Sequence, residues 1–426
     1  MLVTHTSDLH IGAFSNRPLR FADIEAFEEI ANFVIENDIK YLIIAGDFFE
    51  RPRIDNYELL RRVYRILRVL RDSDVFTVAV PGSHDASIRR ADALTLLGEA
   101  GLVHIPYYEE MSDRLVLYPI ECGDLVFYGL PGLKNNLEIN YLHGHKVVFK
   151  DIDKYSDKKI ILVAHTSVKF AGYDPSVYSY RYGKSVIADR EVLQAIPDKI
   201  HYVALGHIHF PTPLFDEAEL NIAYPGSPIG RDANDLYETL LLRRDYGKDR
   251  RFLVVDLSSE RPVAKSMWRS FNIIVEYYKD YYKGYDNLVN EVKRIIRDMG
   301  EGYRVLILDI EGLKPDDKNK VLQTLREYEV SYKTLIHLRT SSRTLVSEAL
   351  SIDLSDVADI EEIEKTAIAE AIKKLGLKIE PEKIQELISI LGERKPEDVR
   401  KDDFYEALFK RIKPLLEEIL SVSKQR

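Results

Sequence analysis

The sequence contains almost no cysteine: Cys122 is the one such residue in a chain of 426. A single cysteine excludes a disulfide framework and a cysteine-based zinc site, and it favours a reducing compartment. No apolar run approaches the roughly 20 residues of a membrane-spanning helix. The opening residues, MLVTHTSDLHIG, also lack the basic start and the long apolar core of a signal peptide. We therefore expect a soluble, cytoplasmic protein that has no membrane partner.

The sequence also has fewer basic than acidic residues: it contains 60 lysines and arginines and 70 aspartates and glutamates, so the net charge is −10. This balance weighs against a protein that coats DNA generally, although a local patch can behave differently. Such a patch occurs at residues 51–71, which carry seven arginines against two acidic residues. A charged fraction of 31% beside one cysteine and four methionines favours a thermophilic source.

Strands and helices alternate along the first half of the chain. Strand-like apolar runs occur at 2–6, 41–45, 75–80, 160–164 and 201–205, and helical periodicity occurs at 21–36 and 57–70. This alternation predicts an α/β fold with a largely parallel sheet and helices on its faces. Residues 114–130 are interpreted as a hairpin.

Composition and periodicity predict four segments. Residues 1–265 form a first domain, 266–339 a small α/β domain with a split βαβ pattern, 340–359 a linker rich in serine, threonine and acidic residues, and 360–426 a helical region. Within the last segment, helices are expected near 360–375, 381–391 and 403–422. The sequence has no Walker motif, GxxxxGKS or GxxxxGKT, so any use of ATP has to come from a partner protein.

Side chains of the kinds that bind metals follow five of the predicted strands. They are Asp8 and His10 after the first, Asp47 after the second, Ser83, His84 and Asp85 after the third, His165 after the fourth, and His207 and His209 after the fifth. Open α/β sheets bind ligands at that edge. Singly, a buried histidine is more often a core residue, and an aspartate is more often a helix cap or a turn residue. Five independent strand ends make a metal centre the better interpretation.

The residue types also indicate the chemistry of this centre. A mixed set of histidine and aspartate without thiolate suits manganese, iron or zinc better than calcium. Two divalent ions about 3.5–4 Å apart can clamp the attacking and the leaving oxygen of a phosphoryl transfer, and a bridging carboxylate offsets their mutual repulsion. The pattern therefore points to phosphoryl transfer at two metal ions.

At this point the sequence resembles the calcineurin-like metallophosphoesterases. The resemblance rests on Asp8-x-His10, Gly46-Asp47, Gly82-x-His84-Asp85, His165 and Gly206-His207-x-His209. The segments SDLHIG, AGDFFE, ALGHIH and YPGSP are similar, more narrowly, to the archaeal meiotic-recombination-eleven type nucleases of double-strand-break repair, called SbcD in bacteria. The family motifs cover about residues 1–230. They imply a β-sandwich flanked by helices, followed by a small α/β cap domain and C-terminal helices.

The resemblance also implies roles for individual residues. It assigns Asp8, His10 and His209 to one metal ion and His165 and His207 to a second, with Asp47 bridging the two. His84 is then the catalytic histidine, which stabilises the transition state or protonates the leaving oxygen, and Asp85 orients its ring. The implied cofactor is Mn²⁺, two ions per subunit. The implied reaction is hydrolysis of DNA phosphodiesters, at duplex ends or in single strands, by exonuclease or endonuclease action.

Two positions depart from the family pattern. Ser83 stands where the family has an asparagine whose carbonyl ligates the second metal ion, and a hydroxyl is a shorter and weaker ligand. We therefore expect a weakened second site that is part-occupied at low manganese concentration. Glu50 stands where relatives often carry a histidine linked to DNA-end processing, and it cannot donate a proton at neutral pH unless its pKa is raised.

The resemblance implies two protein partners as well. Family members dimerise through helices that correspond to residues 57–71 and 91–99, which implies a homodimer. Arg61, Arg65 and Arg68 share one face of the first of these helices, where they either form a solvated surface or bind DNA phosphates. A C-terminal helical segment of the family grips the coiled coil of an ABC-type, SbcC-like repair ATPase, so residues 360–426 are expected to bind such a partner.

Two other functions are compatible with these residues. One is a calcineurin-like phosphatase or phosphodiesterase that acts on non-DNA substrates, because the metal ligands alone do not define the substrate. The other is a DNA-end binding scaffold whose second metal site is impaired by Ser83. Cleavage assays that compare duplex DNA with nucleotides distinguish the three functions.

Overall fold

The computed structural model covers residues 1–426 and describes 1–14, 18–85, 92–170, 190–313 and 315–340, together with residues 372, 380, 383–384, 386–387, 390 and 408–414. Two compact units make up the chain: 1–310 with 314–339, and 311–313 with 340–426. The predicted linker beyond residue 340 lies outside the described residues, and so do most of the predicted C-terminal helices. Residues 408–414 of the last of them are helical.

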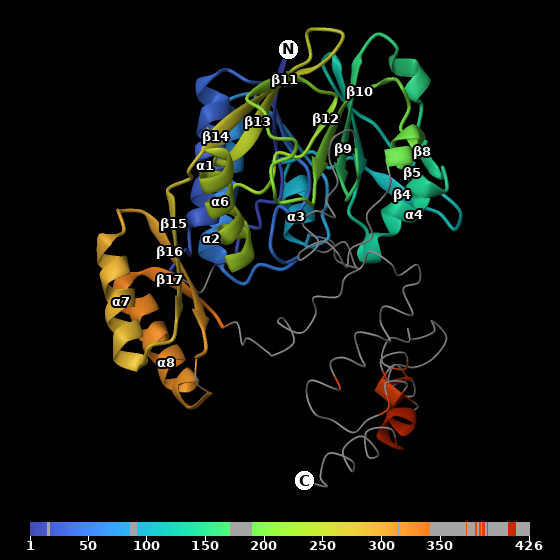
Figure 1. Ribbon diagram of the computed structural model, residues 1–426. Helices are drawn as coiled ribbons and strands as arrows, with labels where there is room; N and C mark the ends of the chain where they lie inside the picture. Colours follow the sequence, from blue (N-terminus) through green and yellow to red (C-terminus); the bar gives the residue numbers. More distant parts are fainter. Residues whose placement is uncertain are drawn as a thin grey trace. The chain divides into compact units, whose positions relative to one another are not determined.

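A six-stranded sheet carries the first strands of the chain (Figure 1). Its strands, in spatial order, are β11 (Glu217–Glu219), β14 (Val263–Arg269), β13 (Arg250–Asp256), β1 (Leu2–Thr6), β2 (Tyr41–Ile44) and β3 (Phe76–Ala79). The three strands β1, β2 and β3 are parallel, as the strand–helix alternation predicts. By contrast, β13 comes from a distant part of the sequence and pairs antiparallel with β1, on the side away from β2.

A five-stranded sheet carries the later predicted strands. Its order is β12 (Ile222–Ala223), β10 (Ile200–Gly206), β9 (Lys159–His165), β7 (Leu125–Leu130) and β6 (Ile120–Cys122). Here β7, β9, β10 and β12 run parallel, and β6 turns back on β7. Only the second half of the segment at 114–130 is therefore a hairpin. Its first strand, β5 (Leu115–Leu117), pairs instead with β4 (Tyr108–Glu110) and β8 (Val147–Phe149) in a small separate sheet.

The two large sheets pack face to face. Alternate residues of β9 show this directly, because Ile161 and Val163 join an apolar cluster with residues of both sheets, such as Val3 and Ile43. Their neighbours Ile160 and Leu162 point to the opposite face and join a second cluster. Since side chains alternate along a strand, an apolar run such as that of β9 is buried on both faces.

Helices cover the outer faces of the sandwich. The six-stranded sheet is covered by α1 (Ala22–Glu36), α2 (Tyr57–Asp72) and α3 (Ala93–Glu99), whose apolar residues share one cluster with the sheet, and α6 (Ala233–Tyr246) contributes Leu236 to that cluster. On the other sheet lie α4 (Leu137–His143), the small sheet and the short helices η1 (Lys134–Asn136), η2 (Ile152–Tyr155) and η4 (Arg190–Ala195). Figure 1 shows α1, α2 and α6 on one side and α4 with β4, β5 and β8 on the other.

The sequence explains α2 well. The side chain of Asn56 caps it by accepting hydrogen bonds from the backbone N–H groups of Glu58 and Leu59. Leu59, Val63, Ile66, Leu67 and Leu70 recur at helical spacing and are buried. The arginines at 61, 65 and 68 lie on the exposed surface.

A small α/β unit follows the sandwich. It consists of β15 (Ile273–Tyr281), α7 (Tyr285–Asp298), β16 (Tyr303–Glu311), α8 (Pro315–Tyr332) and β17 (Thr334–Arg339). The strand order is β15-β16-β17, and α7 and α8 lie on one face of the sheet (Figure 1). The strand–helix order matches the sequence prediction, and the predicted α/β fold of a sandwich with flanking helices and a small α/β unit is confirmed. The domain boundary at 265/266 stays a prediction.

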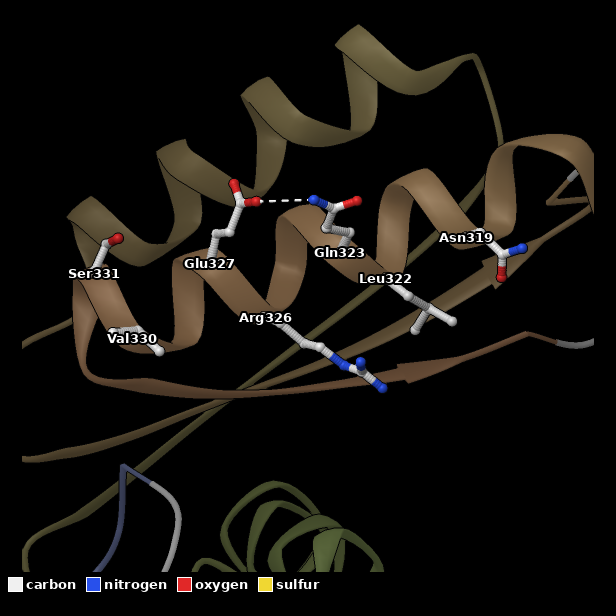
Figure 2. A pocket seen from close by; sticks show the side chains of 7 residues that line it. All are labelled: Asn319, Leu322, Gln323, Arg326, Glu327, Val330 and Ser331. Atoms are coloured by element: carbon white, nitrogen blue, oxygen red, sulfur yellow. Dashed lines mark hydrogen bonds between the residues drawn. The ribbon is translucent and has the colours of Figure 1, made fainter.

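One groove of about 690 Å³ lies on the surface of α8. Its lining residues are Asn319, Leu322, Gln323, Arg326, Glu327, Val330 and Ser331. Figure 2 shows Gln323 and Glu327 together on one side of the helix, joined by a hydrogen bond of 3.4 Å, with Arg326 on another side. No metal-type group of side chains within the described residues includes any of them. None of the helices that the structure describes is long and apolar enough to cross a membrane.

Candidate metal centre

Most of the predicted metal ligands come together at the carboxyl ends of the parallel strands. Three overlapping groups place their donor atoms within 4.8 Å of one another: Asp8, His10 and His209; His10, Asp47 and His84; and Asp8, Asp47 and His165. Asp8, His10 and Asp47 each belong to two groups, so the three groups form one continuous cluster. Its side chains come from the ends of β1, β2, β3, β9 and β10.

The two other predicted ligands lie beside this cluster. The Nδ1 atom of His207 is 3.3 Å from Nε2 of His165, and its backbone N–H lies 3.0 and 3.1 Å from the two carboxylate oxygens of Asp8. The Oγ atom of Ser83 is 3.4 Å from a carboxylate oxygen of Asp47. His207 is therefore adjacent to both Asp8 and His165, whereas Ser83 makes only a long contact with the bridging candidate.

The backbone at this edge adopts an unusual conformation. Asp8, His10, Asp47 and His207 all have positive φ angles, of 52°, 45°, 49° and 94°. Non-glycine residues in this region each cost about 1–3 kcal/mol and persist only where the surrounding structure imposes them. Here the N–H of Asp8 donates to the carbonyl of Gly46 at 3.0 Å, and the N–H of His10 donates to the carbonyl of Asp47 at 3.0 Å. These bonds hold the loops after β1 and β2 together.

Two glycines of the sequence motifs make room for the ligands. A Cβ atom on Gly46 would lie 2.2 Å from Nδ1 of His165, and one on Gly82 would lie 2.1 Å from a carboxylate oxygen of Asp47. Real Cβ atoms do not approach other atoms so closely. The glycines at these positions therefore follow from the close packing of backbone against the metal-type side chains.

Three histidine rings are each fixed through Nδ1. The Nδ1 atom of His10 lies 2.8 Å from the carboxylate of Glu50. That of His209 lies 3.0 Å from both carboxylate oxygens of Asp235, and that of His165 lies 3.0 Å from the carbonyl oxygen of Ala45. Each partner turns the Nε2 atom toward the cluster, which is the usual arrangement around histidines that bind metals.

The remaining donors fit a divalent cation. The Nε2 atoms of His10 and His209 lie 3.0 Å apart, and Nε2 of His165 lies 3.3 Å from a carboxylate oxygen of Asp47. Imidazole nitrogens and carboxylate oxygens without thiolate suit manganese, iron or zinc. The side chains of Asp8, His10, Asp47, His165 and His209 would hold such ions.

Burial makes the charges of this cluster strongly interdependent. Burial lowers the pKa of His165, but Asp47 and Asp8 outweigh it and raise that pKa to about 10. Burial likewise raises the pKa of Asp47, but His165 and His10 hold it well below its usual value. Burial raises the pKa of Asp8 to about 6. Protons on His165 and His10, whose pKa values are raised, thus balance the buried carboxylates, and a bound cation would replace them.

Asp85 does not hold the ring of His84, the predicted catalytic histidine, as the sequence led us to expect. Its carboxylate accepts hydrogen bonds from the backbone N–H groups of Phe48, Phe49 and Gly82, at 2.8 to 3.0 Å. Asp85 therefore ties the loop after β3 to the loop after β2. The ring of His84 is held differently, since its Nδ1 atom lies 3.0 Å from the carbonyl oxygen of Glu50.

Sequence reasoning missed three residues of the site: Ser227, Arg231 and Asp235. Ser227 lies within the YPGSP segment, Arg231 follows that segment, and Asp235 lies in the first turn of α6. The sequence offers one indication of where α6 begins. Asp232 is a typical helix-capping residue, and its side chain accepts hydrogen bonds from the N–H groups of Asn234 and Asp235. Nothing in a single sequence marks Asp235 as a buried partner of a histidine about 26 residues earlier.

Replacing Asp235 by asparagine tests the importance of its contact with His209. We expect Asp235→Asn to weaken divalent metal binding about 10–100-fold, because the ring loses the carboxylate that orients it. Isothermal titration calorimetry with Mn²⁺ measures this change. Asp245→Asn is the matched control, because Asp245 is an exposed acid near the end of the same helix. Unchanged Mn²⁺ affinity in Asp235→Asn would contradict the assignment.

Comparisons with known proteins agree with this geometry. Residues 1–211 match the family of calcineurin-like phosphoesterases. The chain is 28% identical over 240 residues to the DNA double-strand break repair protein Mre11 of Archaeoglobus fulgidus, covering 53% of this chain and 50% of that protein. To Mre11 of Saccharolobus solfataricus it is 23% identical, covering 79% and 77%. To the SbcD component of the SbcCD nuclease of Bacillus subtilis it is 24% identical, covering 67% and 76%.

The share of each relative's length that the match covers differs between the relatives. The chain spans about half the length of the Archaeoglobus fulgidus protein that it matches. The family match and the three groups of metal-type side chains together support use of a divalent metal ion. The predicted superfamily is confirmed: this chain carries a calcineurin-like phosphoesterase domain and is similar to the Mre11 and SbcD proteins.

Proposed function

We propose that this protein is a metal-dependent DNA nuclease that processes DNA ends in double-strand-break repair, with two Mn²⁺ ions per subunit. The observation that carries the proposal is the cluster of buried aspartates and histidines at the strand ends. The names of the relatives, Mre11 and the SbcCD nuclease, support DNA as the substrate.

The proposal gives individual residues of the cluster separate roles as metal ligands or as a catalytic group. Asp8, His10 and His209 would hold one metal ion and His165 and His207 the other, with Asp47 between the two. The hydroxyl of Ser83, which lies 3.4 Å from Asp47, is a short and weak ligand and would make the second site the weaker one. When bound, such ions polarise a phosphate ester and supply a strong nucleophile at neutral pH. The ring of His84 lies beside the ligand His10, with a distance of 4.9 Å between the two ring centroids. This position supports a role for His84 at the reacting phosphate.

The surface next to the cluster suits a polyanion. A groove of about 790 Å³ is lined by three arginines and two acidic residues, among others: Arg20, Arg51, Arg53, Glu50 and Asp55. Arg61, Arg65 and Arg68 continue the positive charge along the exposed surface of α2. Arginines beside a phosphodiesterase centre can bind the phosphates that flank the cleaved bond, without reading the base sequence.

DNA cleavage by the purified protein tests the function. Labelled single-stranded and blunt duplex DNA are incubated with Mn²⁺, with Mg²⁺ or with EDTA. We expect Mn²⁺-dependent cleavage that falls about 10²–10⁴-fold in His84→Gln, because the site loses its catalytic histidine. His143→Gln, an exposed histidine of α4, is the matched control and keeps full activity.

Two outcomes of this experiment would contradict the proposal. DNA binding without cleavage under any metal would favour a DNA-end binding scaffold, which is the function that the weak Ser83 contact favours. Hydrolysis of nucleotides or small phosphate esters without cleavage of DNA would instead favour a calcineurin-like phosphatase of non-DNA substrates.

Two protein partners belong to the proposal. The order of the segments supports a helical region at 360–426 that binds an ABC-type coiled-coil ATPase, which would supply the ATP chemistry that this sequence lacks. A homodimer through helices 57–71 and 91–99 is supported by exposed apolar side chains. Tyr57 (81% exposed) and Tyr64 (42%) lie two turns apart on α2, and Leu96 (55%) lies on α3.

The dimer proposal predicts that a charge on these helices separates the subunits. We expect the double variant Tyr64→Glu, Leu96→Glu to be a monomer, because a carboxylate in a closed apolar interface loses its hydration. Sedimentation equilibrium measures the mass of the variant and of the wild type. Tyr246→Glu, an exposed tyrosine of α6, is the control and leaves the mass unchanged. A monomeric wild type would overturn the dimer.

A further inference from the structure

The loop between β12 and α6 and the first turn of α6 contact three residues of the metal centre. The hydroxyl of Ser227 donates to the carbonyl oxygen of Asp8 at 2.6 Å, and Asp235 holds the ring of His209. Between these two residues stands Arg231, whose Nη1 atom lies 2.7 Å from Nε2 of His84. This loop and the first turn of α6 thus reach a metal-type aspartate, a metal-type histidine and the catalytic histidine.

Hydrogen-bond chemistry determines the direction of the contact between Arg231 and His84. A guanidinium group only donates, so Nε2 of His84 is the acceptor. On the other side of the ring, Nδ1 lies 3.0 Å from the carbonyl oxygen of Glu50, which only accepts. The ring proton therefore sits on Nδ1. In this arrangement Arg231 donates a hydrogen bond to the unprotonated Nε2 atom of His84.

The position of Arg231 is set by the backbone of its own loop. Its N–H donates to the carboxylate of Asp235 at 2.8 Å, and the N–H of Gly230 donates to the hydroxyl of Ser227 at 2.8 Å. The side chain is half-buried. Its charge contributes to lowering the pKa of Glu50, and the side chain forms no ion pair among the residues that the structure describes. A guanidinium has five N–H donors, and the contact with His84 uses one of them.

We propose that Arg231 is a catalytic residue that binds a non-bridging oxygen of the scissile phosphate. This inference rests on the proposed function, because it takes a phosphodiester as the substrate. The planar guanidinium fork matches two phosphate oxygens, and in phosphoryl transfer the developing charge spreads over those non-bridging oxygens. His84 holds the guanidinium in place, and the backbone hydrogen bonds of Gly230 to Ser227 and of Arg231 to Asp235 keep it beside the metal ligands.

The test uses a substrate whose leaving group needs no proton. Wild type, Arg231→Gln, Arg231→Lys and the control Arg261→Gln are compared with bis(4-nitrophenyl) phosphate in the presence of Mn²⁺. Arg261 is a fair control because its side chain is 83% exposed. We expect kcat/KM to fall about 10²–10³-fold in Arg231→Gln, with partial recovery in Arg231→Lys and no change in Arg261→Gln.

Binding of inorganic phosphate to the Mn²⁺-loaded protein provides a second measurement, by calorimetry. We expect Arg231→Gln to bind phosphate at least tenfold more weakly while its Mn²⁺ affinity stays that of the wild type. Unchanged phosphate affinity would overturn the inference. So would an equal loss of Mn²⁺ affinity in the glutamine and lysine variants, since that result would show a purely structural role.

The two proposals can fail separately. If the wild type hydrolyses the small ester but leaves DNA intact, the nuclease proposal fails, and the comparison of Arg231→Gln with the wild type still decides the role of Arg231. If no ester is hydrolysed, the calorimetric comparison of phosphate binding decides it alone. Arg231→Gln could instead lose DNA cleavage while its activity on the small ester and its phosphate affinity stay unchanged. That result would show that Arg231 contacts DNA away from the scissile phosphate, and it would contradict the inference.

Discussion

The structure depends on the burial of two carboxylates, Asp8 and Asp47, in one place. Both are at most 2% exposed, and each lies against histidine rings that are themselves buried. Buried charges of like sign destabilise a fold unless opposite charge balances them. Protonated histidines can supply that charge, and divalent cations can supply it better. The strained backbone angles, the glycine contacts and the carboxylates behind the histidines all serve to keep these groups together.

Much of this arrangement could be predicted from the sequence because strand ends are visible in it. Asp8, Asp47, His84 and His165 each follow an apolar run of strand length, and parallel strands bring their carboxyl ends to one edge. Glycines beside the ligands added to the pattern. The sequence motifs also led to the correct superfamily, which the match of residues 1–211 confirms.

Other parts of the site could not be predicted because they depend on the tertiary packing. Asp235 lies in a helix whose sequence shows no sign of a buried acid, and its partner His209 lies before two intervening strands. Asp85 is adjacent to His84 in sequence, which suggested that it orients that ring. The turn instead aims its carboxylate at three backbone N–H groups. Such contacts follow from the path of the loops and not from residue type or spacing.

We propose that one chain binds two divalent ions between the strand ends and that the site next to Ser83 is the weaker. Calorimetric titration of metal-free protein with Mn²⁺ tests it most directly. We expect two ions per chain that bind in two resolved steps, the second at higher Mn²⁺ concentration. Two equally tight sites would contradict the role given to Ser83. A single ion, or none, would contradict the two-metal centre itself.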